Sequence, residues 1–224
     1  MDHKPLWRMY ELALQFEMLL CGSVPQSKEL IAPWLAARAP EKVPAAVVAG
    51  DAPTLAQLEE EVAASVDNVE ERITLGFQVD GSGLFVRNGT LKAHLKDCGD
   101  QVKKYLDIKA LRSKIANRVF VEPYRLFLMH SPDGPGSVPR VIEKEDGEFE
   151  RAVHVMTPLG PRNALKRIRF VYGPSIAATL RVLTDTEITE NVLRTVLDYG
   201  SVHGYGGERG MGEGRYTYTL VERP

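Results

Sequence analysis

Cysteine, charge imbalance and long apolar runs are all scarce in this chain of 224 residues. Its two cysteines, Cys21 and Cys98, lack the spacing of metal ligands, and we expect both to be buried thiols. No apolar run approaches the roughly 18 residues of a membrane-spanning helix. The first residues also lack the apolar core of a signal peptide, so a cytoplasmic location is the expectation.

The sequence also lacks the common catalytic and cofactor motifs. It contains no phosphate loop with its lysine, no His-Glu-x-x-His, no Gly-x-Ser-x-Gly and no Cys/His metal set. Its one glycine-rich stretch, residues 203–214, follows a predicted helix and precedes a predicted strand. A Rossmann fingerprint requires the opposite order. We therefore reject a nicotinamide or flavin site and expect no metal or cofactor.

The formal net charge of −2 gives no overall argument for a polyanionic partner. The charge is unevenly distributed, however. Residues 41–71 are strongly acidic, whereas residues 160–182 contain five cationic side chains and no acidic one. Such asymmetry can hide a basic groove inside a neutral total. The alternative is that these charges only protect an exposed strand edge from aggregation.

Hydrophobic periodicity divides the chain into alternating strands and helices. Leu12, Leu14, Phe16, Met18 and Leu20 recur with period two, which predicts a half-buried strand. Asn88 is a suitable N-cap for a helix through Leu106, with Lys92, His94 and Lys96 away from its apolar face. Further helices are predicted over 54–66, 109–116 and 189–202, and further strands over 73–79, 84–86, 119–129, 152–157, 168–172, 175–183 and 215–221.

This order of elements predicts an α+β fold, with an antiparallel sheet and helices on one of its faces. A ferredoxin-like, RRM-like βαββαβ core with insertions fits best. We expect a single domain over 1–224, with an acidic helical insertion at about 39–71. Proline, glycine and charged residues over 130–150 predict a thumb-like loop.

The C-terminal stretch reads as helix, glycine-rich loop and strand. Thr189 is the predicted N-cap, and Val192, Leu193, Val196 and Leu197 share one apolar face. The loop that follows interleaves glycines with Tyr205, Arg209 and Met211. Glycines free the backbone for positive φ, and consecutive N–H groups of such a loop can form a nest for anions. The other interpretation is a flexible connection without a ligand.

Three stretches resemble the RAMP superfamily, the RRM-like proteins of CRISPR effector complexes. They are the opening strand that runs into Cys21-Gly22-Ser23, the segment 84–95 that turns into a basic helix, and the glycine loop. The loop has two glycine–hydrophobic–glycine units, 204–206 and 210–212, around a spacer that contains Arg209. That spacer is three residues long, shorter than the usual five. Proteins of this shape also occur in phage and mobile elements.

The resemblance implies a non-catalytic subunit of an antiviral ribonucleoprotein that holds single-stranded RNA, or nucleic acid more broadly, along its backbone. Copies of such a protein polymerise along a guide RNA, so further copies or other subunits are the expected protein partners. The implied binding residues are the cations and loop residues Lys92, Lys96, Arg162, Lys166, Arg167, Arg169, Gly204, Tyr205, Gly206, Gly207, Arg209, Gly210 and Gly212. Tyr205 is the expected base-stacking ring.

Two other functions stay open. One is a metal-independent endoribonuclease of the same superfamily, in which His203 is the weak candidate for the general base and Lys166 or Tyr205 assists. His94 and His154 are weaker candidates. The other is a phage-encoded accessory protein that keeps the fold and acts through protein contacts of its acidic helix at 54–66.

Overall fold

The computed structural model describes residues 5–26, 31, 73–130, 138–157, 160–184 and 187–223. Of residues 154–157 and 160–164 it describes the backbone alone. The acidic insertion predicted at 39–71 therefore lies outside the described residues, which resume at β4 (Ile73–Gly76).

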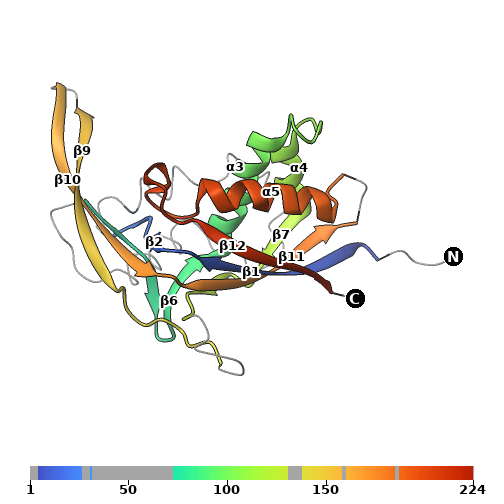
Figure 1. Ribbon diagram of the computed structural model, residues 1–224, viewed down its shortest axis with the longest axis horizontal. Coiled ribbons are helices and arrows are strands. Elements are labelled where there is room, and N and C mark those ends of the chain that lie inside the picture. Colours follow the sequence, from blue (N-terminus) through green and yellow to red (C-terminus); the bar gives the residue numbers. More distant parts are fainter. Residues whose placement is uncertain are drawn as a thin grey trace.

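A four-stranded antiparallel sheet forms the centre of the molecule. Its order is β12 (Tyr216–Arg223), β1 (Trp7–Phe16), β11 (Ser175–Leu183) and β7 (Val119–Glu122). The helices α3 (Asn88–Val102), α4 (Leu111–Arg118) and α5 (Glu190–His203) lie on one face (Figure 1). Along the chain, α3 lies between β1 and β7, and α5 lies between β11 and β12. This connectivity is that of the predicted ferredoxin-like core. The α+β prediction is confirmed.

Period-two alternation explains why the central sheet packs on one face. Tyr10, Leu12, Leu14 and Phe16 of β1 are almost fully buried beneath the helices, whereas Glu11 between them is exposed. Met18 does not continue this pattern and is 60% exposed. The predicted strand breaks there, and the chain resumes in β2 (Leu19–Cys21), which pairs with another sheet.

The second sheet has the order β2, β10 (Gly160–Tyr172), β4 and β3 (Val24–Pro25), and β9 (Gly147–Thr157) pairs with β10. The two sheets meet where β10 passes into β11. There the Phe16 N–H donates to the Pro174 carbonyl, and the Gly173 N–H donates to the Met18 carbonyl. A third sheet contains β5 (Gln78–Asp80), β6 (Gly83–Arg87) and β8 (Arg125–Phe127).

The β9–β10 hairpin projects beyond the central sheet (Figure 1). A thumb-like element was predicted, but over 130–150, and this hairpin begins only at Gly147. Strands predicted at 152–157 and 168–172 are longer than periodicity indicated. Of the predicted thumb, residues 131–137 lie outside the described part of the chain.

Two local predictions on the helices need correction. Asn88 does not cap α3; its side-chain amide donates instead to the Val121 carbonyl, at 2.8 Å, and Arg87 is the N-cap. The predicted strand 119–129 is interrupted at Pro123 and splits into β7 and β8. By contrast, Thr189 caps α5 as predicted, because its hydroxyl accepts from the Val192 N–H.

Candidate nucleic-acid interface

The glycine-rich loop connects α5 to β12 and is folded by its own backbone. Gly204, Gly206 and Gly214 all have φ between 74° and 86°, a region that residues with a Cβ rarely adopt. The Tyr205 N–H donates to the Gly214 carbonyl at 2.9 Å, which closes the loop at its base. A Cβ on Gly214 would overlap the Tyr205 carbonyl. The glycines therefore shape a defined structure.

The loop also docks onto the edge of the second sheet. The Gly207 N–H donates to the Cys21 carbonyl and the Gly214 N–H to the Leu19 carbonyl, both at 2.9 Å. Gly207 thus extends the sheet beside β2. Several amides expected to hold a polyanion are consequently occupied by protein carbonyls. The apex, Gly210–Gly212, stays exposed to solvent.

Tyr205 occupies the interior, so the expectation that its ring stacks on a base does not fit this structure. Its side chain is 3% exposed, and its ring lies against those of Phe16 and His94. The hydroxyl shares a hydrogen bond with the Thr90 hydroxyl at 2.6 Å. Burial raises the pKa of this phenol well above its usual range. Tyr205 therefore anchors the loop to α3.

Glu208 joins the glycine loop to the β9–β10 hairpin. Its carboxylate receives Lys166 Nζ at 2.5 Å and Arg151 at 2.6 Å, from the paired positions of β10 and β9. Lys166 is one of the predicted binding residues, whereas Glu208 and Arg151 are not among them. Arg209 follows in the chain, and its guanidinium lies beside His203. The cluster of Glu208, Lys166 and Arg151, with Arg209 next to it in the loop, is the loop–hairpin seam.

Two other predicted cations of β10, Arg167 and Arg169, are paired inside the hairpin. Arg167 contacts Glu150 at 3.0 Å, and Arg169 approaches Glu148 at 3.7 Å. The register places these residues directly opposite one another, which is the favourable cross-strand arrangement for opposite charges. The basic run of β10 therefore lies beside acidic residues of β9. These residues are not within the run itself, so its sequence does not reveal them. Arg162 belongs to β10, among residues whose side chains are not described.

Lys92 and Lys96 lie on α3 and are turned elsewhere. Lys92 Nζ sits 4.5 Å from the centre of the Phe120 ring in β7. Burial, aided by the nearby charge of Lys96, lowers the pKa of Lys92. Because β7 and β12 form opposite edges of the central sheet, Lys92 points away from the strand into which the glycine loop leads. Lys92 therefore lies apart from the seam.

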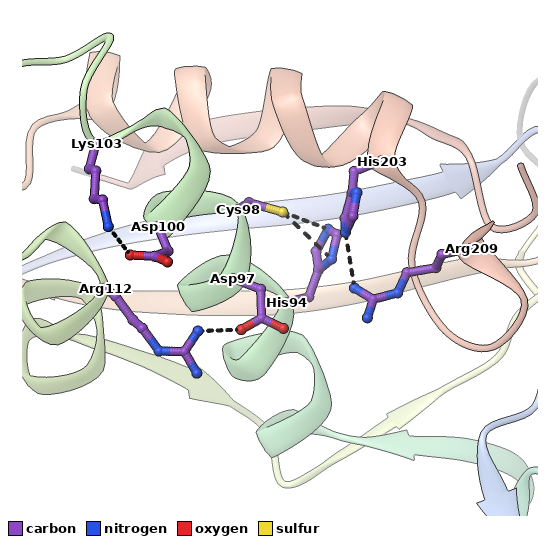
Figure 2. Close-up of polar contacts among 8 residues, drawn as sticks. All are labelled: His94, Asp97, Cys98, Asp100, Lys103, Arg112, His203 and Arg209. Atoms are coloured by element: carbon purple, nitrogen blue, oxygen red, sulfur yellow. Dashed lines mark hydrogen bonds and ion pairs between the residues drawn. The ribbon is translucent and has the colours of Figure 1, made fainter. Parts of the chain in front are cut away.

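His203 lies at the end of α5, beside the loop. Arg209 Nη1 is 3.3 Å from His203 Nε2 (Figure 2). The imidazole also stacks on the Tyr199 ring. Burial and the Arg209 charge lower the pKa of His203, against the opposing effect of Asp97. His203 is therefore a neutral imidazole at pH 7, partly open to solvent. His154 belongs to β9, and its side chain is not described.

His94 is buried, contrary to the expectation that it lies away from the apolar face of its helix. It contacts the Tyr216 hydroxyl at 2.9 Å. Figure 2 shows its contact with the Cys98 sulfur, at 3.7 Å. Burial, with Arg209 and His203 nearby, lowers its pKa to about 3. Cys98 and Cys21 are both buried free thiols, as expected, and burial raises the pKa of each to about 12.

Among the described residues, no group of three or more His, Cys, Asp or Glu side chains is placed to hold a metal ion. The described helices also include none long and apolar enough to cross a bilayer. The arrangement that remains for chemistry is electrostatic: cations and an exposed glycine apex at the loop–hairpin seam, with one neutral imidazole at its side.

Comparison with known proteins gives structural likeness alone. No family model and no curated protein matches the chain. A chain of a Type IV-B CRISPR complex is similar, with 13% identity and a TM-score of 0.43 over 95% of this chain and 90% of that one. A chain of the Type III-B Cmr-beta complex bound to cognate target RNA is similar with 6% identity and a TM-score of 0.40, over 96% of this chain and 61% of that one.

Proposed function

We propose that this protein is a non-catalytic subunit of a CRISPR-type ribonucleoprotein that binds single-stranded RNA along its phosphate backbone. The binding site in this proposal is the loop–hairpin seam. One observation carries it: the contacts of Glu208 with Lys166 and Arg151 hold the glycine loop against the hairpin. Two sets of residues that are distant in sequence thereby form one positively charged surface.

The chemistry of the seam supports this proposal. Arg151, Lys166 and Arg209 carry three positive charges against the two negative charges of Glu208 and Glu213 in the loop, and this small excess favours a polyanion. The exposed apex at Gly210–Gly212 has no Cβ at two of its three positions, which permits close approach of a strand. The RRM-like fold and the glycine-loop resemblance favour RNA over DNA.

Arginine 209 provides the direct test. We expect wild-type protein to bind a fluorescein-labelled 20-nucleotide RNA at low salt, and Arg209→Ala to weaken binding about 3–10-fold. The slope of log K against log salt should fall by about 0.7, since each phosphate contact on a single strand contributes that much. Fluorescence anisotropy over a salt series measures both quantities.

Lys103→Ala is the matched control. It removes one positive charge from the far end of α3, where Lys103 pairs with the exposed Asp100, and it should leave affinity and slope nearly unchanged. If wild-type protein shows no saturable binding of single-stranded RNA or DNA at low salt, the proposed function is wrong.

A second candidate, metal-independent RNA cleavage, is favoured by the state of His203. A neutral and partly exposed imidazole beside Arg209 suits a general base that takes the 2′-hydroxyl proton. Tyr205 does not suit the role of proton donor, because it is buried and bonded to Thr90. Incubation with labelled RNA in EDTA separates the candidates. Cleavage by wild type that His203→Ala abolishes would favour the enzyme, and intact RNA would exclude it.

A further inference from the structure

Glu208 has a backbone position that would ordinarily be given to glycine. Its φ is 55°, and Gly206, Gly207 and Gly210 surround it. A residue with a Cβ is strained in this region. Since the loop uses glycine freely elsewhere, a carboxylate at this point indicates a use for the side chain itself.

The contacts of that side chain resemble those of a phosphate. One oxygen, Oε1, accepts from Lys166 at 2.5 Å, and the other, Oε2, accepts from Arg151 at 2.6 Å. A phosphodiester also presents two oxygens that share a negative charge, and Lys and Arg are its usual partners. Lys166 and Arg151 are therefore spaced to hold an oxyanion.

Solvent reaches the two cations unequally, since the Lys166 side chain is 22% exposed. The Glu208 side chain is 6% exposed, whereas that of Arg151 is 43% exposed. The carboxylate is ionised in the folded protein: burial would raise its pKa, but the hydrogen bonds from Lys166 and Arg151 lower it overall. An incoming phosphate therefore competes with a full negative charge.

Release of Glu208 need not unfold the loop. The backbone on either side is fixed by other bonds, from the Gly207 N–H to Cys21 and from the Met211 N–H to the Glu208 carbonyl itself. Rotation of the Glu208 side chain alone breaks neither of these main-chain bonds.

We propose that Arg151 and Lys166 form a phosphate-binding site which the Glu208 carboxylate occupies until a nucleic-acid backbone displaces it. This inference rests on the proposed function, because it assigns regulation to the same seam. Glu208 acts as an internal competitor that weakens non-specific binding of short polyanions. A strand that also engages Arg209 and the glycine apex has the additional contacts needed to displace the carboxylate.

Glu208→Gln tests the displacement. If Glu208 competes with phosphate, the variant binds the 20-nucleotide RNA about 5–10-fold more tightly than wild type, with a salt slope steeper by about 0.7–1.4 for one or two added phosphate contacts. If Glu208 only holds the loop in place, the same variant binds RNA more weakly and melts at a lower temperature. The two interpretations predict opposite signs, and anisotropy with a thermal melt measures both.

Glu213→Gln is the matched control, since Glu213 lies in the same loop and makes no ion pair with a described residue. It changes the net charge equally and should alter affinity less than 2-fold. Adding Arg151→Gln to Glu208→Gln should remove most of the gain. Where Glu208→Gln does not fold, Glu208→Asp keeps the charge but shortens its reach, and a smaller gain in affinity is expected.

The outcomes separate this inference from the function on which it rests. If no variant and no wild-type protein binds single-stranded nucleic acid, the proposed function fails and the displacement fails with it. If wild type binds and Arg209→Ala weakens binding, but neither Glu208 variant binds more tightly, the function stands and the displacement is wrong.

Discussion

At the scale of single residues, the interior beside the glycine loop is unusually polar. His94, Cys98 and Tyr216 converge on Gly200 of α5, where a Cβ would lie less than 3.0 Å from both His94 Nε2 and the Tyr216 hydroxyl. The absence of a side chain at Gly200 therefore lets α5 approach α3 closely. This contact fixes the end of α5 from which the loop begins.

His94 should make the stability of the protein depend on pH. Its folded pKa is about 3, below the value of about 6.5 in an unfolded chain, so the unfolded state binds a proton that the native state excludes. Stability is then lost as pH falls below about 6.5. Between pH 7.5 and 5 the expected loss is about 2 kcal/mol, measured by urea unfolding at each pH.

The variant His94→Gln should lose most of this dependence, because glutamine does not titrate. His130→Gln changes an exposed histidine and should keep the wild-type profile. A wild-type stability that stays flat from pH 7.5 to 5, or a dependence that persists in His94→Gln, would contradict the assignment.

The predicted positions of single side chains were wrong where a polar residue is buried. His94 precedes Cys98 by one helical turn and so lies on the same stripe of α3, but its chemistry suggested a surface position. Tyr205 follows the end of a helix in a glycine-rich loop, and nothing local indicates that the loop folds back on the core. Both are decided by tertiary packing.

At the scale of elements, the loop and the hairpin depend on each other. The loop shapes the site through its positive-φ glycines and through bonds to Leu19 and Cys21 of β2. The hairpin contributes Lys166 and Arg151. Arg167 and Arg169 are paired with Glu150 and Glu148 across the hairpin, whereas Lys166 and Arg151 meet the loop at Glu208.

Gly214→Ala should disrupt the loop. A Cβ at this position would overlap the Tyr205 carbonyl, and φ is 74°. We expect a loss of at least about 2 kcal/mol in the free energy of unfolding, and weaker RNA binding under the proposed function. Urea unfolding measures the first, and hydrogen exchange at Gly207 and Gly214 reports whether the loop has left β2.

Gly210→Ala is the comparison, because Gly210 is exposed and its added Cβ would meet nothing within 4 Å. It should change stability by less than about 0.5 kcal/mol. Equal effects of the two substitutions would mean that the loop is not held by close packing at Gly214.

The existence of these elements was predictable, and their pairing was not. Periodicity located the helix that begins after Thr189 and the strand that follows the loop, because apolar spacing and capping are local signals. The acidic partners of Arg167 and Arg169 come from another strand. Only the register of β9 against β10 brings Glu148 and Glu150 opposite them, and register is set by the folded sheet.

At the scale of the whole molecule, the order of elements was sufficient to predict the core. The order of elements is strand, helix, two strands, helix, strand. Few sheet topologies are possible for this order when connections are short and right-handed. The observed order β12–β1–β11–β7 is the ferredoxin-like one. The second sheet and its projecting hairpin could not be predicted from the order of elements. They are insertions into the core, and no general rule fixes where an insertion packs.

If the protein polymerises along RNA as the resemblance implies, the number of bound copies should grow with RNA length. Mass photometry with RNAs of 10, 20 and 40 nucleotides would count the copies, and Arg209→Ala should shift each distribution toward free protein. One copy per strand at every length and at saturating protein would contradict assembly, while leaving binding by a single copy intact.

The pairing of β1 with β12 has a consequence for synthesis of the protein. Glu11 and Arg223, which contact each other across these strands, are 212 positions apart. β12 pairs with one edge of β1 but is translated long after it. That edge of β1 is therefore unpaired while the chain emerges from the ribosome. An unpaired apolar edge can pair with other nascent chains, so production of the folded protein should depend on chaperones.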